Sequence, residues 1–257
     1  MKILLTNDDS HDSPLFLLAI ELLKNYGELR IVVPAEEQSW KGKSMTRYGK
    51  LAVDKILLDG TQAYSITGTP ADCANIGIHN LWPDKPDILV SGINLGINTG
   101  LGFLLASGTV GASLEANIVG LPGIAISQQI SIEDHKLWDK ERRFTDETMH
   151  KVREVISDTL PKIWQHCVVD NPQPRATWSV NIPLDPVEGG AQICETRLGE
   201  TYYGQCYTQT GQQFHHNLQP FPSDQSEDTD EVVVRGGNVS ASVVDLRLLG
   251  QRPINPN

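Results

Sequence analysis

Segments typical of β-strands and of α-helices alternate through the first 130 residues of the chain. The strand-like segments are short apolar or alternating runs: the run that starts the chain and stops at Asn7, then 29–33, 50–58, 63–66, 87–91 and 123–127. Between them lie helix-like stretches at 15–26, from Thr69 onward, and at 109–119. This alternation predicts a mostly parallel sheet with right-handed crossovers, in a Rossmann-like core of three layers, α/β/α.

The rest of the chain changes in character at about residue 185. A long amphipathic helix is expected over 145–165 and a buried strand over 178–182, while the charged stretch 131–143 is most simply a solvated loop. Residues 186–231 are rich in Gly, Gln, Thr and Tyr without a helical period, which predicts β-hairpins or extended arms, and strands are expected over 232–249. We therefore expect a single domain over 1–257, with a core at about 1–185 and a C-terminal β-hairpin extension at about 186–257.

Length and charge restrict the classes of protein to which the chain can belong. Of its 257 residues 39% are hydrophobic, enough for a sizeable core, and no stretch approaches the roughly 20 apolar residues of a membrane span. The apolar run at the N-terminus is shorter than the roughly 7–15 residues of a signal peptide's apolar region. The formal net charge of −11 would repel DNA or RNA. We expect no nucleic-acid polymer and no membrane as partner, whereas a small phosphorylated substrate can still bind locally.

The four cysteines indicate a reducing compartment. Cys73, Cys167, Cys194 and Cys206 form no CxxC motif and have no histidine at zinc spacing. They are typical of reduced, partly buried thiols, so we expect a cytoplasmic protein.

Two adjacent carboxylates, Asp8 and Asp9, follow the first strand. Ligands of an open α/β sheet bind at the carboxyl ends of its strands. Two like charges at one strand end repel each other unless a cation lies between them. Asparagine and aspartate also favour turns, so a solvated turn without a metal is the alternative from this feature alone.

Two further loops follow strands and carry oxygen-rich side chains. The loop 34–44 contains Ser39, and the loop 91–100 contains Asn94 and Asn98. In a doubly wound sheet both loops gather at the same edge as the two carboxylates. Carboxylate, hydroxyl and amide oxygens without clustered histidine or cysteine predict a hard cation, Mg²⁺, Mn²⁺ or Ca²⁺, rather than zinc.

The segment Ser107-Gly108-Thr109 stands where the helix expected at 109–119 begins. Small residues at a helix N-terminus leave backbone N–H groups open to a phosphate. An ordinary capped helix is the alternative. Beside a cation site the segment favours phosphate binding, and the two features together indicate phosphoryl chemistry.

Two familiar nucleotide-binding motifs fail in detail. Gly42-Lys43-Ser44 ends like a Walker A loop, but Glu37 stands where the first glycine belongs. No GxGxxG follows the first strand, so no dinucleotide cofactor is expected.

Several sequence blocks, in a fixed order, resemble one family. They are Ile3-Leu4-Leu5-Thr6-Asn7-Asp8-Asp9, Gln38-Ser39, Gly68-Thr69-Pro70-Ala71-Asp72-Cys73, Ser91-Gly92-Ile93-Asn94 with Asn98, and Ser107-Gly108-Thr109-Val110, then Asn181-Ile182-Pro183 and Asp228-Thr229-Asp230 before Val239-Ser240. In these blocks the chain resembles the SurE family of stationary-phase survival proteins, which are metal-dependent 5′/3′-nucleotidases. The resemblance covers essentially the whole chain and is strongest before residue 127.

The resemblance implies a role for residues of every loop above. The implied metal ligands are Asp8, Asp9, Ser39 and Asn94, with Asp8 and Asp9 also catalytic, and the implied phosphate contacts are Asn98, Ser107, Gly108 and Thr109. The family also implies one divalent cation per subunit, Mg²⁺ or Mn²⁺, with Ca²⁺ able to occupy the site. It further implies a homodimer or homotetramer formed through the C-terminal extension.

Three positions depart from the family's usual pattern. Ser10 and Trp40 stand where family members usually have glycine, and Ala106 stands where an aromatic residue is common. These positions border the substrate, so they leave the base preference open.

The expected reaction is hydrolysis of nucleoside monophosphates to nucleoside and phosphate, with the 5′ or 3′ preference also open. The alternatives are a phosphatase for another small monoester or short polyphosphate, and a nucleotide-binding or scaffold protein without catalysis.

Overall fold

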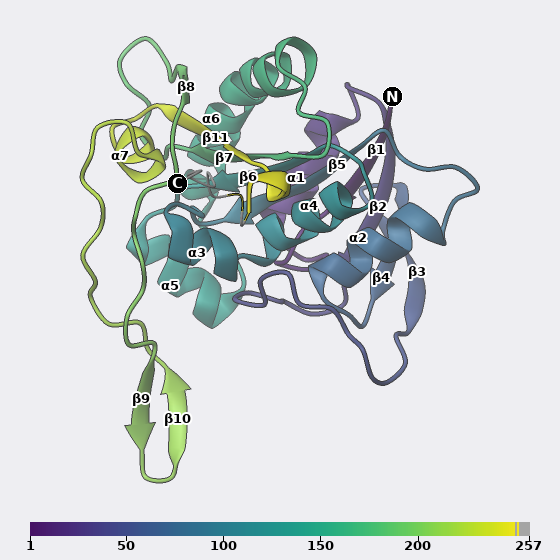
Figure 1. The fold of residues 1–257 in the computed structure, drawn as a ribbon, viewed down its shortest axis with the longest axis horizontal. Helices are drawn as coiled ribbons and strands as arrows, with labels where there is room; N and C mark the ends of the chain where they lie inside the picture. Colours follow the sequence, from purple (N-terminus) through teal and green to yellow (C-terminus); the bar gives the residue numbers. More distant parts are fainter. Residues whose placement is uncertain (250, 252–257) are drawn as a thin grey trace, which may run out of the picture.

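The computed structural model describes residues 1–249 and residue 251, and its centre is a nine-stranded sheet with helices packed against it (Figure 1). The strands lie in the order β3-β4-β2-β1-β5-β6-β7-β11-β8. Their bounds are β1 (Lys2–Thr6), β2 (Glu28–Pro34), β3 (Val53–Leu58), β4 (Thr61–Ile66), β5 (Ile88–Leu95), β6 (Gly123–Gln128), β7 (Thr177–Ile182), β8 (Ile193–Glu195) and β11 (Val239–Val244). The strands from β4 to β7 are parallel, whereas β3 and β11 run antiparallel to β4 and β7. The predicted mostly parallel sheet is confirmed.

Helices fill most of the connections between the strands. They are α1 (Pro14–Leu23), α2 (Pro70–His79), α3 (Leu101–Ala106), α4 (Gly108–Ile118), α5 (Ile132–Glu141), α6 (Asp146–Trp164) continued by the π-helical turn η1 (Gln165–Asp170), α7 (Asp230–Arg235) and the 3₁₀ turn η2 (Leu246–Leu248). Capping explains where α2 begins, because Thr69 and Asp72 each accept a backbone N–H from the other and Pro70 occupies the first helical position. Within residues 1–249, no helix has the length and apolar character needed to cross a bilayer.

Alternate residues of the central strands face two separate hydrophobic cores. Ile3 and Leu5 of β1 pack with side chains of α1 and α6, whereas Leu4 packs with side chains of α2 and α4. All three leucine and isoleucine side chains are fully buried. A parallel sheet that is buried on both faces lies between two layers of helices, so the predicted three-layer arrangement is confirmed.

The order of the strands reverses between β1 and β5. From β1 the sheet continues through β2 and β4, and from β5 it continues on the other side through β6 and β7. In open α/β sheets a ligand binds beyond the carboxyl ends of the strands at such a reversal. The loops that follow β1 and β5 therefore lie where a site is expected.

Two local predictions were wrong. The stretch 131–143, predicted as a solvated loop, contains α5, and its Trp138 is only 1% exposed beneath the guanidinium of Arg142, 4.0 Å from the ring centroid. One buried aromatic residue anchors this charged helix, which is too sparse a signal to appear as an apolar period. Residues 232–249, predicted as strands, hold most of α7 and η2 as well as β11.

Part of the predicted C-terminal extension belongs to the main sheet. Strands β8 and β11 form one edge of the nine-stranded sheet, so the sheet continues beyond the boundary predicted at about residue 185. The hairpin of β9 (Tyr207–Thr210) and β10 (Gln213–His216) projects from the body of the molecule, and all residues of its two strands are exposed (Figure 1). The single domain predicted over 1–257 includes residues 250 and 252–257, which lie outside the described residues.

Candidate active site

A cavity of about 660 Å³ opens at the reversal of strand order. It is lined by six of the eight residues predicted to form the site: Asp8, Asp9, Ser39, Asn94, Asn98 and Ser107. The other two, Gly108 and Thr109, lie directly behind Asp8. A Cβ atom built on Gly108 would come within 2.8 Å of Asp8 Oδ2, and the hydroxyl of Thr109 donates to Asp8 Oδ1 at 2.5 Å. The fold therefore gathers residues that are up to 101 positions apart in the chain.

The two carboxylates of the site are buried side by side. Asp8 is 4% exposed and Asp9 3% exposed, and Asp9 Oδ2 accepts the backbone N–H of Leu95 at 3.1 Å. Burial raises the pKa of Asp8, and burial followed by the charge of Asp8 raises the pKa of Asp9 well above its usual value. A cation between the two carboxylates would offset both the burial and the repulsion.

The hydroxyl proton of Ser39 is engaged by Glu37. Its hydroxyl donates to Glu37 Oε1 at 2.6 Å, and the other oxygen of Glu37 forms an ion pair with Arg142. Arg142 also donates to the backbone carbonyl of Asp9 at 3.2 Å. The lone pairs of Ser39 are thus left for a cation. Glu37 lay within a loop singled out in the sequence without receiving a role, and Arg142 lay in the stretch predicted as a loop.

Asn94 completes a donor set of oxygens. Its side-chain nitrogen donates to the carbonyl of Gly96 at 2.7 Å, which leaves its carbonyl oxygen as the atom for a ligand. Two carboxylates, one hydroxyl and one amide oxygen suit a hard divalent cation. Among the described residues, no group of three or more His, Cys, Asp or Glu side chains could hold a metal ion, so a cation here would depend on the hydroxyl and amide oxygens as well as on the two carboxylates. The residues present therefore fit the predicted kind of metal.

Asn98 and Ser107 line the same cavity. The Asn98 side chain donates to Ser127 Oγ at 2.9 Å, and its backbone N–H donates to Asn181 Oδ1 at 2.8 Å. Ser107 is the N-cap of α4, and its hydroxyl oxygen accepts the N–H of Val110 at 3.2 Å. The cap uses a lone pair and leaves the hydroxyl proton free to donate, so capping and anion binding are compatible here. Thr109, by contrast, directs its hydroxyl to Asp8.

An aromatic cluster forms one wall of the cavity. Trp40 is 40% exposed, and its ring centroid lies 5.8 Å from that of Phe103, 5.1 Å from that of Tyr203 and 4.7 Å from that of His216. Helix α5 also lines the cavity, with Ile132, His135 and Trp138. Trp40 was expected to border the substrate, but neither wall was predicted as a whole, because each is assembled from segments that meet only in the folded chain.

The two residues that replace the family's glycines keep a glycine-like backbone. Ser10 has a φ of 75° and Trp40 a φ of 63°, in the left-handed region that favours glycine. Such a conformation costs a residue with a side chain about 1–2 kcal/mol. At Ser10 the hydroxyl offsets part of this cost by donating to the Pro34 carbonyl at 3.0 Å. Ala106, the third departure, lines the cavity.

Comparison with known proteins gives one consistent result. The family model "Survival protein SurE" matches residues 3–205. The 5′-nucleotidase SurE of Methanothermobacter thermautotrophicus is 35% identical over 204 residues, which cover 79% of this chain and 75% of the relative. The 5′-nucleotidase SurE of a Thermoanaerobacter species is 33% identical over 263 residues, which cover 99% and 96%. The crystal structure of the Sure protein from Aquifex aeolicus matches with a TM-score of 0.72 at 28% identity, covering 97% of this chain and 95% of that one.

Proposed function

The chain belongs to the SurE family, and we propose that it is a metal-dependent 5′-nucleotidase, which hydrolyses nucleoside monophosphates to nucleoside and phosphate. The observation that carries the proposal is the pair of buried carboxylates beside the N-terminus of α4. Asp8 and Asp9 face the same cavity as Ser107, the N-cap of that helix. A cation site next to an anion site is what a phosphate monoester requires.

Each oxygen donor of the site has a role in this proposal. Asp8, Asp9, Ser39 and Asn94 would hold the cation, with Mg²⁺ or Mn²⁺ preferred because all four ligands are oxygens. A bound divalent cation supplies charge neutralisation of the phosphoryl group and lowers the pKa of water at the site. One of the two acids, Asp8 or Asp9, would also orient or deprotonate the attacking water in line with the leaving oxygen.

The other side of the cavity would bind the phosphoryl oxygens. Asn98, Ser107 and the backbone at Gly108 would donate hydrogen bonds to these oxygens as their negative charge builds. Thr109 would act beside them by fixing the orientation of Asp8, to which its hydroxyl already donates. Glu37, which accepts the hydroxyl proton of Ser39, would fix the orientation of Ser39.

A phosphate-release screen tests the proposal. The substrates are nucleoside 5′- and 3′-monophosphates, sugar phosphates and short polyphosphates, each with Mn²⁺ or Mg²⁺ and with EDTA. Release from nucleoside monophosphates, abolished by EDTA, is the expected result. Preference for sugar phosphates or polyphosphates would favour a different phosphatase, and no release from any substrate would favour a binding or scaffold role.

Trp40 is proposed to stack on the nucleotide base. Stacking on an aromatic ring is worth about 1–3 kcal/mol per base and tolerates every base. Because Trp40 already has three aromatic neighbours, we expect Trp40→Gly to raise KM for purine and pyrimidine nucleoside monophosphates about tenfold, near the low end of that range. Steady-state hydrolysis of p-nitrophenyl phosphate, which has no base, should be unchanged. The left-handed backbone at position 40 suits glycine, so the fold should be kept.

The control for this variant is Tyr202→Ala. Tyr202 is an exposed aromatic residue, 55% accessible, and is not among the residues that line the cavity. Tyr202→Ala should leave the kinetic constants for nucleoside monophosphates and for p-nitrophenyl phosphate unchanged. Unchanged kinetics for Trp40→Gly, with a shifted elution volume on a sizing column, would instead place Trp40 in a subunit contact.

We also propose that the chain forms a homodimer or homotetramer through the β9–β10 hairpin. A lone two-stranded hairpin is marginally stable in water, and this one contacts Trp40 through His216 at the end of β10, so a partner surface would stabilise the rest of it. Strand pairing puts Tyr207 and Phe214 on the same face of the hairpin, and their side chains are 57% and 65% exposed.

We also propose a cytoplasmic location for the protein. The proposal is supported by its four cysteines, which form no disulfide.

Sedimentation tests the hairpin proposal. Tyr207→Ser combined with Phe214→Ser should shift the mass distribution toward smaller species, because it removes the apolar face that a second subunit would cover. Thr208→Ser combined with His215→Ser alters the opposite face of the hairpin and serves as the control. A wild-type protein that sediments as a monomer at all concentrations would contradict the proposal.

A further inference from the structure

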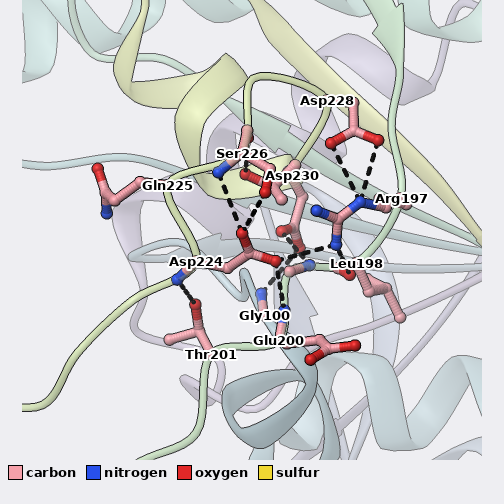
Figure 2. A network of polar contacts seen from close by, with 12 residues as sticks. Gly100, Arg197, Leu198, Glu200, Thr201, Asp224, Gln225, Ser226, Asp228 and Asp230 are labelled. Atoms are coloured by element: carbon pink, nitrogen blue, oxygen red, sulfur yellow. Dashed lines mark hydrogen bonds and ion pairs between the residues drawn. The ribbon is translucent and has the colours of Figure 1, made fainter.

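Asp230 is a fully buried carboxylate where the C-terminal arm (residues 199–230) returns to the core (Figure 2). Its Oδ2 accepts the backbone N–H of Gly100 at 2.8 Å, and its Oδ1 accepts those of Gly199 and Glu231 at 3.0 Å each. Burial raises the pKa of Asp230, while these three donors favour its charged form. One side chain thus joins the two ends of the arm to a loop 130 residues earlier in the chain.

That loop is the Asn98 loop (residues 96–100), which carries a proposed phosphate contact. It is held by side chains at two alternate positions, since the N–H of Asn98 donates to Asn181 and the N–H of Gly100 donates to Asp230. Gly100 has a φ of 74°. Gly100 forms the turn of the loop only two residues after Asn98. A shift of the Gly100 backbone would therefore change the position of Asn98 in the cavity.

The start of the arm packs directly against the residues that follow Asn98. A Cβ atom on Gly100 would lie 2.6 Å from the Cβ of Thr201, which leaves space for glycine only. The N–H of Leu101 donates to the Gly199 carbonyl and that of Gly102 to the Thr201 carbonyl, each at 3.0 Å. The arm and the Asn98 loop therefore form one hydrogen-bonded unit, with Asp230 buried in its centre.

We propose that Asp230 is a positioning residue, which holds Asn98 toward the phosphoryl group through the backbone of Gly100 and links the active site to the base of the C-terminal arm. The inference rests on the proposed function for the role of Asn98 and extends it to a residue outside the cavity. Asp230 touches neither substrate nor cation in this proposal. It acts only through the loop.

The same network supplies a matched control. Asp228 accepts two hydrogen bonds from Arg197 Nε at 3.0 Å, and Asp224 accepts one from Arg197 Nη1 at 2.9 Å (Figure 2). Among the described residues, the hydrogen bonds of Asp228 go to Arg197, two residues before the arm begins, and none reaches the Asn98 loop. Asp228→Asn thus makes the same chemical change as Asp230→Asn, at a carboxylate that has no hydrogen bond to the Asn98 loop.

The test uses the full-length, metal-loaded protein. Asp230→Asn puts an NH₂ group opposite backbone N–H groups: at the Oδ2 position it removes the bond from Gly100, and at the Oδ1 position it removes those from Gly199 and Glu231, so in either orientation the junction of the arm and the Asn98 loop loses acceptors. We expect kcat/KM for a nucleoside monophosphate to fall about tenfold. This is the usual size of the effect when a residue that orients a binding group, without touching the bound species itself, is replaced. The inhibition constant of inorganic phosphate should rise by a similar factor, and Asp228→Asn should change neither by more than about twofold.

A double-mutant cycle separates positioning from general stability. In an Asn98→Ala background, Asp230→Asn should have little further effect on kcat/KM, because the side chain that it positions is gone. Effects that multiply, or a lower melting temperature with unchanged kinetics, would overturn the proposal. Should Asp230→Asn not fold, Asp230→Glu keeps the charge and displaces the acceptor by one methylene, and the same readouts apply.

Hydrogen exchange makes the test independent of turnover. In protein without metal, the amides of residues 98–102 should exchange faster in Asp230→Asn than in the wild type or in Asp228→Asn. Failure of the proposed function would appear as a wild type that releases no phosphate, whereas failure of this inference would appear as unchanged exchange in Asp230→Asn.

Discussion

Asp8→Asn or Asp9→Asn should lower phosphate release from nucleoside monophosphates by about 100- to 1,000-fold or more, measured at saturating Mn²⁺. Each variant removes one of two charged ligands from a set whose other proposed members, Ser39 and Asn94, are neutral. Removal of an electrostatic group that acts on the developing phosphoryl charge is among the largest single effects in catalysis.

Thermal unfolding in EDTA should show the opposite trend. The pKa of each carboxyl is raised by burial, and the charge of Asp8 raises that of Asp9 further, so the metal-free protein holds like charges at a cost. An asparagine at either position removes the repulsion, and we expect an unchanged or higher melting temperature. Asp12→Asn is the control, because Asp12 lies in the same loop with its side chain 52% exposed. Full activity of either site variant in excess EDTA would end the metal hypothesis.

The sequence was sufficient to predict those parts of the site that follow from strand order. Asp8 is the second residue after β1 and Asn94 lies in β5, and a parallel sheet whose order reverses between those strands must bring the two together. Ser39 follows β2, the other neighbour of β1, so it lies at the same edge. Hydrophobic alternation and helix caps were enough to place these elements.

Contacts between distant segments could not be predicted in this way. Arg142 contacts Glu37, 105 positions away in the sequence, and Asp230 contacts Gly100, 130 positions away. In neither pair does the local sequence around one residue indicate which residue it will contact. Helix α5 was missed for a related reason, since its one buried aromatic residue packs against other parts of the chain. Side chains that orient the residues of a site through hydrogen bonds are brought there by tertiary packing, and local sequence does not indicate them.

Gly108→Ala is expected to have the second largest effect, about 100-fold in kcat/KM, although it adds only a methyl group. A Cβ atom at this position would lie 2.8 Å from Asp8 Oδ2 and 2.9 Å from Asp8 Cβ, so Asp8 or the start of α4 must move. Asp8 is the proposed cation ligand and the acceptor for Thr109, and a displacement of about 1 Å at such a group costs about 100-fold in rate.

Stability should not follow activity in this variant. Alanine is a better helix former than glycine by about 1 kcal/mol in a helix interior, and at Gly108, the first residue of α4, a gain of this kind offsets part of the cost of the close contact with Asp8. Gly204→Ala is the control, because a Cβ atom there would meet nothing within 4 Å. Kinetics and melting temperature measured on the same preparations separate the two effects. Wild-type kcat/KM in Gly108→Ala would mean that Asp8 has room to move without loss, and that the close approach of α4 to this carboxylate is not needed for catalysis.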